Sequence, residues 1–120
     1  MKEVLISIKA VSEEIRIRLL LLLMDREACV CELMSVFHMP QSKLSHHLIT
    51  LRDAGLLQDE KRGKWNYYRV DSKSLSAKNR EILISLSRLL VDDGTIENDK
   101  RRLDRVKQIM SVKSCPTVSV

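Results

Sequence analysis

Apolar residues recur at the spacing of an α-helix along most of this sequence. This period predicts helices over 2–10, 15–24, 30–37, 41–54 and 75–91, and a last amphipathic helix that Thr95 is placed to cap. Ser12 is expected to cap the second helix, with Glu13 and Glu14 in its first turn. That helix is apolar on nearly every side over 19–23, so it should be central and buried. The inward face of the last helix is expected to hold Leu103, Val106, Ile109 and Met110.

Two of these helices and the segment after them form a recognisable arrangement. The short helix 30–37, a turn at Pro40 and the helix 41–54 read as a helix-turn-helix, and Gly55 ends its second helix. Polar and apolar residues then alternate over 56–70 around a turn at Arg62 and Gly63, which predicts a β-hairpin beside the helix pair. We therefore expect a mainly α protein with a small β-hairpin: a winged helix-turn-helix.

The chain is expected to divide into two parts. Residues 1–93 form the DNA-binding and dimerisation domain, and residues 94–120 form a C-terminal helix and a flexible tail. The apolar stripes of the first and fifth helices are the expected dimer faces, since a single helix-turn-helix reads few bases and favours twofold symmetry.

Charge and composition narrow the class of partner. The 120 residues carry a formal net charge of +5. Basic residues outnumber acidic ones over 41–70 and again over 98–113, which suits a polyanion such as double-stranded DNA. No apolar run is long enough to span a bilayer and no secretory pattern opens the chain, so a cytoplasmic location without membrane contact is expected.

The cysteines are the candidate chemistry. There are three of them, Cys29, Cys31 and Cys115, and an odd number in a reducing compartment favours ligation or redox sensing over a disulfide framework. On a regular helix, residues two apart point about 200° away from each other. Either Cys29 and Cys31 lie at an unwound helix end, or an ion that binds both must unwind the helix, and we expect this strain to be the signal.

Three stretches, "CVCEL", "QSKLSHHLITLRDAGLL" and "RGKWNYYRV", occur in this order. In this respect the chain resembles the ArsR/SmtB family of metal-responsive winged-helix repressors, and in particular the regulators of arsenical resistance. The resemblance covers roughly residues 11–90. It implies that Cys29 and Cys31 match the first two thiols of the family's "C-V-C-D-L-C" motif, whereas Glu32 replaces the Asp and Met34 stands where a third thiol would be. The Asp and His ligands of zinc sensors are not seen over 75–90.

The resemblance implies a homodimeric repressor that is not an enzyme and uses no organic cofactor. As(III) or Sb(III) is the expected inducer, because soft thiolates select such ions. They prefer three sulfurs, and Cys115 is the candidate for the third, with a solvent or small-thiol ligand as the alternative. Inducer binding should distort the start of helix 30–37 and so release the DNA. A repressor that responds to Cd(II) or Pb(II), and a thiol redox sensor, remain alternatives.

Base edges and phosphates are expected to meet the outward side of helix 41–54 and the tip of the hairpin. The predicted DNA-binding residues are Gln41, Ser42, Lys43, Ser45, His46, His47, Lys61, Arg62 and Lys64. For His47 a packing role is the alternative.

Overall fold

The computed structural model describes residues 1–112. Its elements are α1 (Lys2–Ala10), α2 (Glu14–Leu22), β1 (Ala28–Cys29), α3 (Val30–Phe37), α4 (Gln41–Asp53), β2 (Gln58–Arg62), β3 (Trp65–Arg69), α5 (Ala77–Leu89) and α6 (Gly94–Val112). Helices dominate, and the three strands form one small antiparallel sheet. The predicted fold class, a winged helix-turn-helix, is confirmed.

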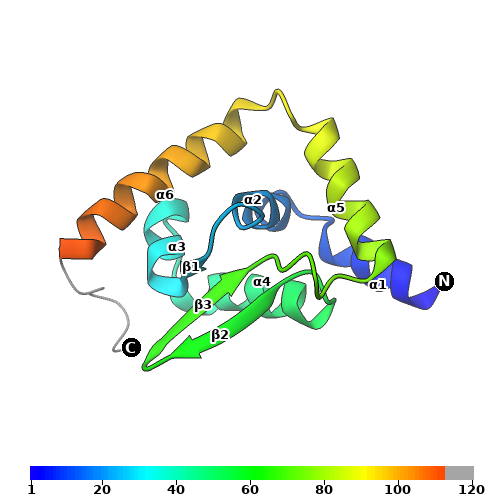
Figure 1. The fold of residues 1–120 in the computed structure, drawn as a ribbon, viewed down its shortest axis with the longest axis horizontal. Helices are drawn as coiled ribbons and strands as arrows, with labels where there is room; N and C mark the ends of the chain where they lie inside the picture. Colours follow the sequence, from blue (N-terminus) through cyan, green and yellow to red (C-terminus); the bar gives the residue numbers. More distant parts are fainter. Residues whose placement is uncertain (113–120) are drawn as a thin grey trace.

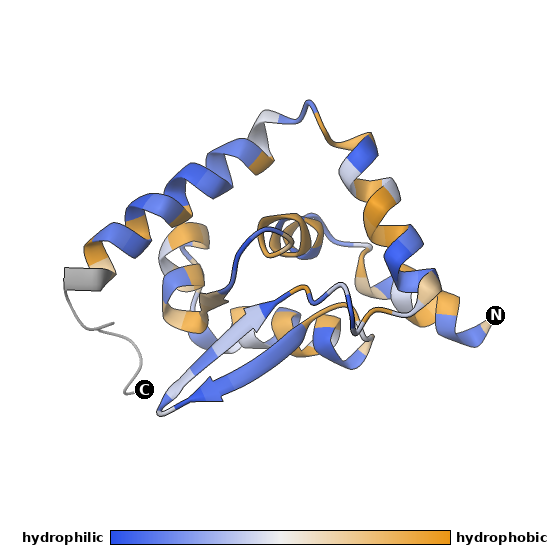
Figure 2. Cartoon of the chain, viewed as in Figure 1, coloured by the Kyte–Doolittle hydropathy of each residue, from blue (hydrophilic) through white to orange (hydrophobic). Residues whose placement is uncertain are grey.

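The helices surround α2, which lies in the middle of the molecule (Figure 1). α5 and α6 lean together above it as an arch, and α4 and the sheet lie below. Leu19, Leu20, Leu22 and Leu23 are fully buried, and α2 is largely coloured as hydrophobic in Figure 2. A stretch that is apolar on nearly every side, as 19–23 is, can only be stable inside the core, as expected from the sequence.

The helix-turn-helix consists of α3 and α4. Leu44, Leu48 and Leu51 lie on the inner side of α4 and are completely buried. The turn between the helices begins at His38, which has a positive φ of 51°, and Pro40 then precedes the first residue of α4. At the other end of α4, Gly55 takes the predicted left-handed conformation with φ of 79°.

The sheet contains one strand more than the predicted hairpin. Its strand order is β1-β3-β2, so the wing strand β3 pairs on one side with β2 and on the other with the two-residue strand β1. Cys29 of β1 lies opposite Tyr67 of β3. The segment that carries the first cysteine is therefore hydrogen-bonded to the wing.

The last helix is part of the same core. α6 packs against both α2 and α3, and its Leu103 is fully buried. Arg18 of α2 donates two hydrogen bonds to the buried carboxylate of Asp99, at 2.9 and 2.8 Å. These contacts fix the direction in which α6 runs across the thiol-bearing end of α3.

Three sequence expectations about the helices are wrong. Thr95 does not cap the last helix: α6 begins at Gly94, and the backbone N–H of Thr95 donates to Oδ1 of Asp93 at 2.8 Å. Ser12 does not cap α2: Glu13 holds that position, and the Ser12 hydroxyl donates instead to the carbonyl of Lys9. Ile109 does not face inward, because 58% of its surface is exposed. In residues 1–112 no helix combines the length and the apolar character that crossing a membrane would require.

Candidate functional site

The two cysteines meet at the junction of β1 and α3. Cys29 precedes the first helical residue and has an extended backbone, with φ of −86° and ψ of 163°. Cys31 lies in the first turn of α3, and the two sulfur atoms are 2.9 Å apart. Two sulfurs that bind one ion at about 2.3 Å each can be separated by at most about 4.6 Å. The pair is therefore already close enough to share an ion.

This geometry corrects the expectation that strain is the signal. The 200° separation applies only when both residues have helical backbone. Cys29 does not, so its side chain turns toward Cys31 without any unwinding of α3. Of the two possibilities drawn from the sequence, the helix-end arrangement is the correct one.

Glu32 connects the thiol pair to α6. Its Oε1 accepts a hydrogen bond from the backbone N–H of Cys29 at 3.0 Å, and Nζ of Lys107 donates to the same oxygen at 3.1 Å. In return the Cys29 sulfur faces the amide of Glu32, as in a capping box. Burial raises the pKa of the Cys29 thiol, and the nearby Glu32 carboxylate adds to this increase.

A small cavity of about 80 Å³ opens beside the cysteines. It is lined by Cys29, Val30, Cys31, Met34, Gln41, Lys64 and Asn66. Gln41 is the first residue of α4, and Lys64 belongs to the wing turn. The cavity thus lies where the thiol pair, the second helix of the helix-turn-helix and the wing come together.

A third protein ligand is not found in the described part of the chain. Residues 1–112 contain no group of three His, Cys, Asp or Glu side chains placed to hold a metal ion. Met34 lines the cavity, but its thioether is a weak donor. Cys115, the predicted third ligand, lies outside the described residues.

The outward face of α4 carries most of the predicted DNA-binding side chains. Ser42, Lys43 and His46 are exposed, and Gln41 and Ser45 are partly exposed. This face is mostly polar, and Ile49 is its one large apolar side chain exposed to solvent, whereas large apolar side chains fill the opposite side of the helix. It can offer hydrogen-bond donors and acceptors to base edges and phosphates.

His47 does not belong to this face. Only 6% of its surface is exposed, and its Nδ1 accepts a hydrogen bond from Nε of Arg16 at 3.0 Å. Burial lowers the pKa of His47, and the positive charge of Arg16 lowers it further. The neutral imidazole therefore fixes α4 to α2, which is the packing role that the sequence left open.

The tip of the wing carries two lysines without an ion pair among the described residues and one arginine, Arg62, with two, and Nζ of Lys64 lies over the ring of Trp65. Within residues 1–112, Lys61 and Lys64 have no ion pair and are exposed. Arg62 instead contacts the carboxylates of Glu27 and Glu60 at 2.5 and 2.8 Å, and its guanidinium lies over the ring of Tyr67. We expect the two lysines to be more available to phosphates than Arg62.

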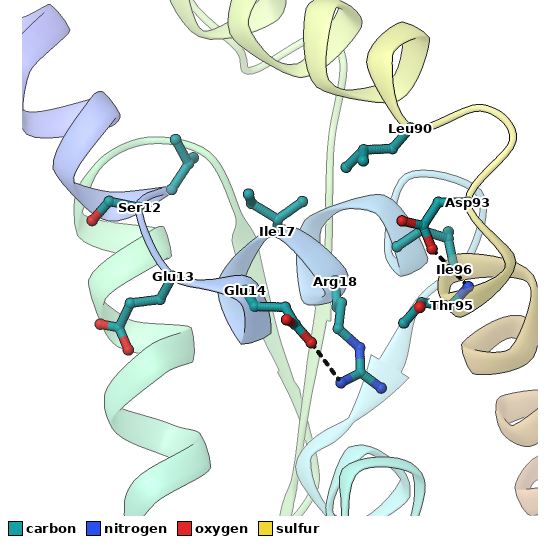
Figure 3. A pocket seen from close by; sticks show the side chains of 10 residues that line it. Ser12, Glu13, Glu14, Ile17, Arg18, Leu90, Asp93, Thr95 and Ile96 are labelled. Atoms are coloured by element: carbon teal, nitrogen blue, oxygen red, sulfur yellow. Dashed lines mark hydrogen bonds and ion pairs between the residues drawn. The ribbon is translucent and has the colours of Figure 1, made fainter.

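A second cavity, of about 460 Å³, lies between α2 and the turn that joins α5 to α6. Figure 3 shows Glu14 and Arg18 of α2 on one side of it and Leu90 and Asp93 on the other. It includes none of the predicted cysteines or DNA-binding residues.

Sequence reasoning missed several residues of the thiol site: Glu32, Lys107 and Asn66. A capping-box signal was present for Glu32, because it stands three residues after the helix cap. Lys107 is 75 residues from Glu32 along the chain, and no local pattern signals such a contact.

Comparison with known proteins finds similar regulatory proteins. A family described as "Bacterial regulatory protein, arsR family" matches residues 13–59. The arsenic resistance transcriptional regulator ArsR1 of Pseudomonas putida is 42% identical over 74 residues, which span 58% of this chain and 58% of that protein, little more than half its length. The arsenical resistance operon repressor of Bacillus subtilis is 36% identical over 81 residues, 67% of this chain and 77% of that protein. The structure of HlyU from Vibrio cholerae matches 76% of this chain and 95% of its own, with 31% identity and a TM-score of 0.65.

Proposed function

The chain belongs to the arsR family of bacterial regulatory proteins, and we propose that it is a transcriptional repressor which binds operator DNA as a homodimer and is released by As(III) or Sb(III). The inducer binds the thiolates of Cys29 and Cys31. The observation that carries this proposal is the 2.9 Å separation of their sulfurs at the junction between β1 and α3. The names of the curated relatives, which are regulators of arsenic resistance, support the choice of inducer.

DNA recognition is assigned to α4 and the wing. The second helix of a helix-turn-helix enters the major groove. The exposed side chains of Ser42, Lys43 and His46, with Gln41 at the helix start, are placed to contact bases and phosphates there. Lys61 and Lys64 extend the basic surface along the wing, where they can neutralise phosphates.

Dimerisation is assigned to α1 and α5. These helices contact each other and leave several large apolar side chains in solvent: Leu5, Ile6 and Ile8 on α1, and Ile84 and Leu89 on α5. Covering this surface with a second copy would remove apolar area from water and generate the twofold symmetry that places two α4 helices in successive major grooves.

We attribute induction to the position of the two thiols beside α4 and the wing, and not to an unwinding of α3. Cys29 pairs with Tyr67 of the wing, and the cavity beside the thiols is also lined by Gln41 and Lys64. An ion held by the two sulfurs would therefore lie next to Gln41, the first residue of α4, and next to Lys64 of the wing, and could displace both. Inducer and DNA then bind in opposition, with a coupling free energy of typically ~1–3 kcal/mol.

The test measures release from DNA. A duplex selected from a random pool by the purified protein serves as the operator, and fluorescence anisotropy follows its dissociation as arsenite is added. Cys29→Ser and Cys31→Ser should bind the duplex like the wild type but resist release. Met34→Leu, which changes a neighbouring sulfur of the same cavity, is the matched control and should respond normally. Normal release of either serine variant at the wild-type arsenite concentration contradicts the proposal.

The same titration separates the alternatives. Cd(II) and Pb(II) should release the duplex only at higher concentrations than As(III) and Sb(III), because they would require further sulfurs. Peroxide should have no effect at concentrations at which arsenite acts. Release at lower concentrations of Cd(II) or Pb(II) than of As(III) would favour a sensor of those ions. Release by peroxide but not by arsenite would favour a redox sensor.

A further inference from the structure

Ile49 is an exposed apolar side chain on an otherwise polar helix face. It belongs to α4, and 39% of its surface is exposed. The other exposed large apolar residues of the described chain lie at the first residue, on α1, on or just after α5, and on α6. Proteins commonly expose single apolar side chains, so exposure alone does not mark a site. What distinguishes Ile49 is its place on the helix assigned to DNA.

Ile49 lies in the same row along α4 as residues assigned to base recognition. Seven residues of a helix turn through about 700°, roughly 20° short of two full turns. The side chain of Ile49 therefore points nearly in the direction of Ser42, and it follows His46 by three residues. Ser42 and His46 are exposed as well, whereas Leu48 is fully buried. Ile49 thus extends the outward row into the C-terminal half of the helix.

The polar side chains that follow Ile49 on α4 are engaged within the protein. Oγ1 of Thr50 donates to the backbone carbonyl of His46 at 2.9 Å. The guanidinium of Arg52 contacts two carboxylates, each at 3.3 Å, and one of them is Asp53. Asp53 is negatively charged, so phosphates repel it. In this half of α4, Ile49 is therefore the exposed side chain best suited to approach the bases.

We propose that Ile49 is a specificity-determining residue that reads a thymine through its 5-methyl group. The inference rests on the proposed function, in which α4 enters the major groove. Base edges there present hydrogen-bond donors and acceptors, and the thymine methyl is the apolar group among them. Isoleucine forms no side-chain hydrogen bond, so it distinguishes bases in this groove by removing that methyl group from water.

Helix geometry predicts where this thymine lies. Ile49 is about 10.5 Å further along the axis of α4 than Ser42, at roughly 1.5 Å per residue. Successive nucleotides of one strand are about 3.4 Å apart along the DNA axis. The thymine should therefore lie about three base pairs from the pair that Ser42 contacts, when the helix follows the groove. Twofold symmetry should repeat it in the other half-site.

The experiment removes the methyl group from the DNA and the side chain from the protein in turn. The duplex that the wild-type protein selects from a random pool is prepared with each thymine replaced by uracil, which lacks only the 5-methyl group. Fluorescence anisotropy measures the affinity of each duplex for wild type, Ile49→Ala and Ile49→Val. At one symmetric pair of positions, uracil should weaken wild-type binding roughly fifteenfold, or about fourfold for the methyl group in each half-site.

The variants show whether Ile49 is the residue responsible. At these positions Ile49→Ala should bind thymine and uracil equally, while Ile49→Val, which keeps the branched Cβ, should retain most of the discrimination. The matched control is Ile109→Ala, which shortens an exposed isoleucine of α6 in the same way and should discriminate like the wild type. The proposal is overturned if the selected duplex has no thymine under α4, if uracil weakens the wild type at no position, or if Ile49→Ala shows the same losses as the wild type.

Sedimentation equilibrium tests a different role for the same side chain. Wild type and Ile49→Ala should form dimers of equal affinity, and a weaker dimer in the variant would mean that Ile49 contacts a second copy, which overturns the proposal. Failure of the wild type to bind any duplex would instead count against the proposed function, and against this inference with it. Loss of the methyl discrimination alone counts against the inference only, so the two failures are distinguishable.

Discussion

Lys107 and Glu32 form an ion pair in which Nζ lies 3.1 Å from Oε1, and the same oxygen receives the backbone N–H of Cys29. The pair joins α6 to the first turn of α3, and the Glu32 side chain is only 12% exposed. The ammonium group of Lys107 thus lies beside Glu32, the residue that follows Cys31 in the sequence. It offsets the carboxylate that would otherwise oppose formation of a Cys29 thiolate.

Replacing Lys107 should therefore weaken inducer binding. In Lys107→Met the Glu32 carboxylate is uncompensated, so the pKa of Cys29, which is already raised by burial and by Glu32, should rise further. Since the ligand in the proposed function is the thiolate, arsenite affinity at neutral pH should fall. The pH dependence of alkylation of Cys29 should shift upward in parallel.

The control is Lys100→Met, which removes another lysine of α6 that pairs with Asp25 and Glu97. It makes the same change in net charge and should leave alkylation and arsenite binding unchanged. Identical behaviour of the two variants would show that Lys107 has no specific role. The loss of stability in each should stay within about 1 kcal/mol, as for other partly exposed pairs.

Arg18 should be essential for stability. Asp99 is 1% exposed and is held by two hydrogen bonds from Arg18. Arg18→Ala leaves this carboxylate buried and unpaired, so the free energy of unfolding should fall by about 3 kcal/mol or more. Urea unfolding followed by circular dichroism measures the difference. Glu14→Gln, which removes only the exposed 3.6 Å contact of the same arginine, should cost less than about 0.5 kcal/mol.

His47 should make stability depend on pH. Its pKa is lowered in the folded protein by burial and by Arg16, so the unfolded chain binds the proton more readily. Stability is then complete above the unfolded pKa of about 6.5 and is lost as the pH falls below it. Thermal unfolding of the wild type between pH 7 and pH 5 should show a steeper loss than that of His47→Gln. The matched control variant is His46→Gln, which removes the exposed neighbouring imidazole of the same helix.

The wing lysines should control the salt dependence of DNA binding. Lys61→Gln and Lys64→Gln should each reduce the slope of log affinity against log salt by about 1.8, the effect of two lost phosphate contacts, one in each subunit of the proposed dimer. Arg62→Gln should change the slope less, since Arg62 is already paired with Glu27 and Glu60. Affinities of the three variants at several salt concentrations would decide this. An equal slope change for Arg62 would mean that DNA displaces its carboxylate partners.

Local periodicity predicted the helices and the wing because each apolar stripe has to face one core. The expected helix 30–37 coincides with α3 (Val30–Phe37), and the expected stripe of Leu44, Leu48 and Leu51 is buried. The strand β1 was missed because two residues carry no period. Because β1 was not predicted, the extended backbone of Cys29 was not predicted either. The short distance between the two sulfurs depends on that backbone.

The burial of His47 could have been recognised from the sequence. It stands three residues after Leu44 and four before Leu51, on the side of α4 that packs inward. Its partner Arg16, however, is 31 residues away. The side-chain oxygen of Asn66, which is buried without a hydrogen-bond partner among residues 1–112, likewise depends on how β3, α3 and α4 meet, which no single segment specifies.

The pairing of β1 with β3 has a consequence for anyone who wishes to reprogram this protein as a biosensor. Because Cys29 and Tyr67 are neighbours in one sheet, we expect that changes made to retune the proposed metalloid site will also alter the position of the hairpin that we propose approaches the promoter. Libraries that vary the two properties separately should yield few improved clones. Joint variation of the cysteine segment and the hairpin, with selection for both traits at once, is the more productive route.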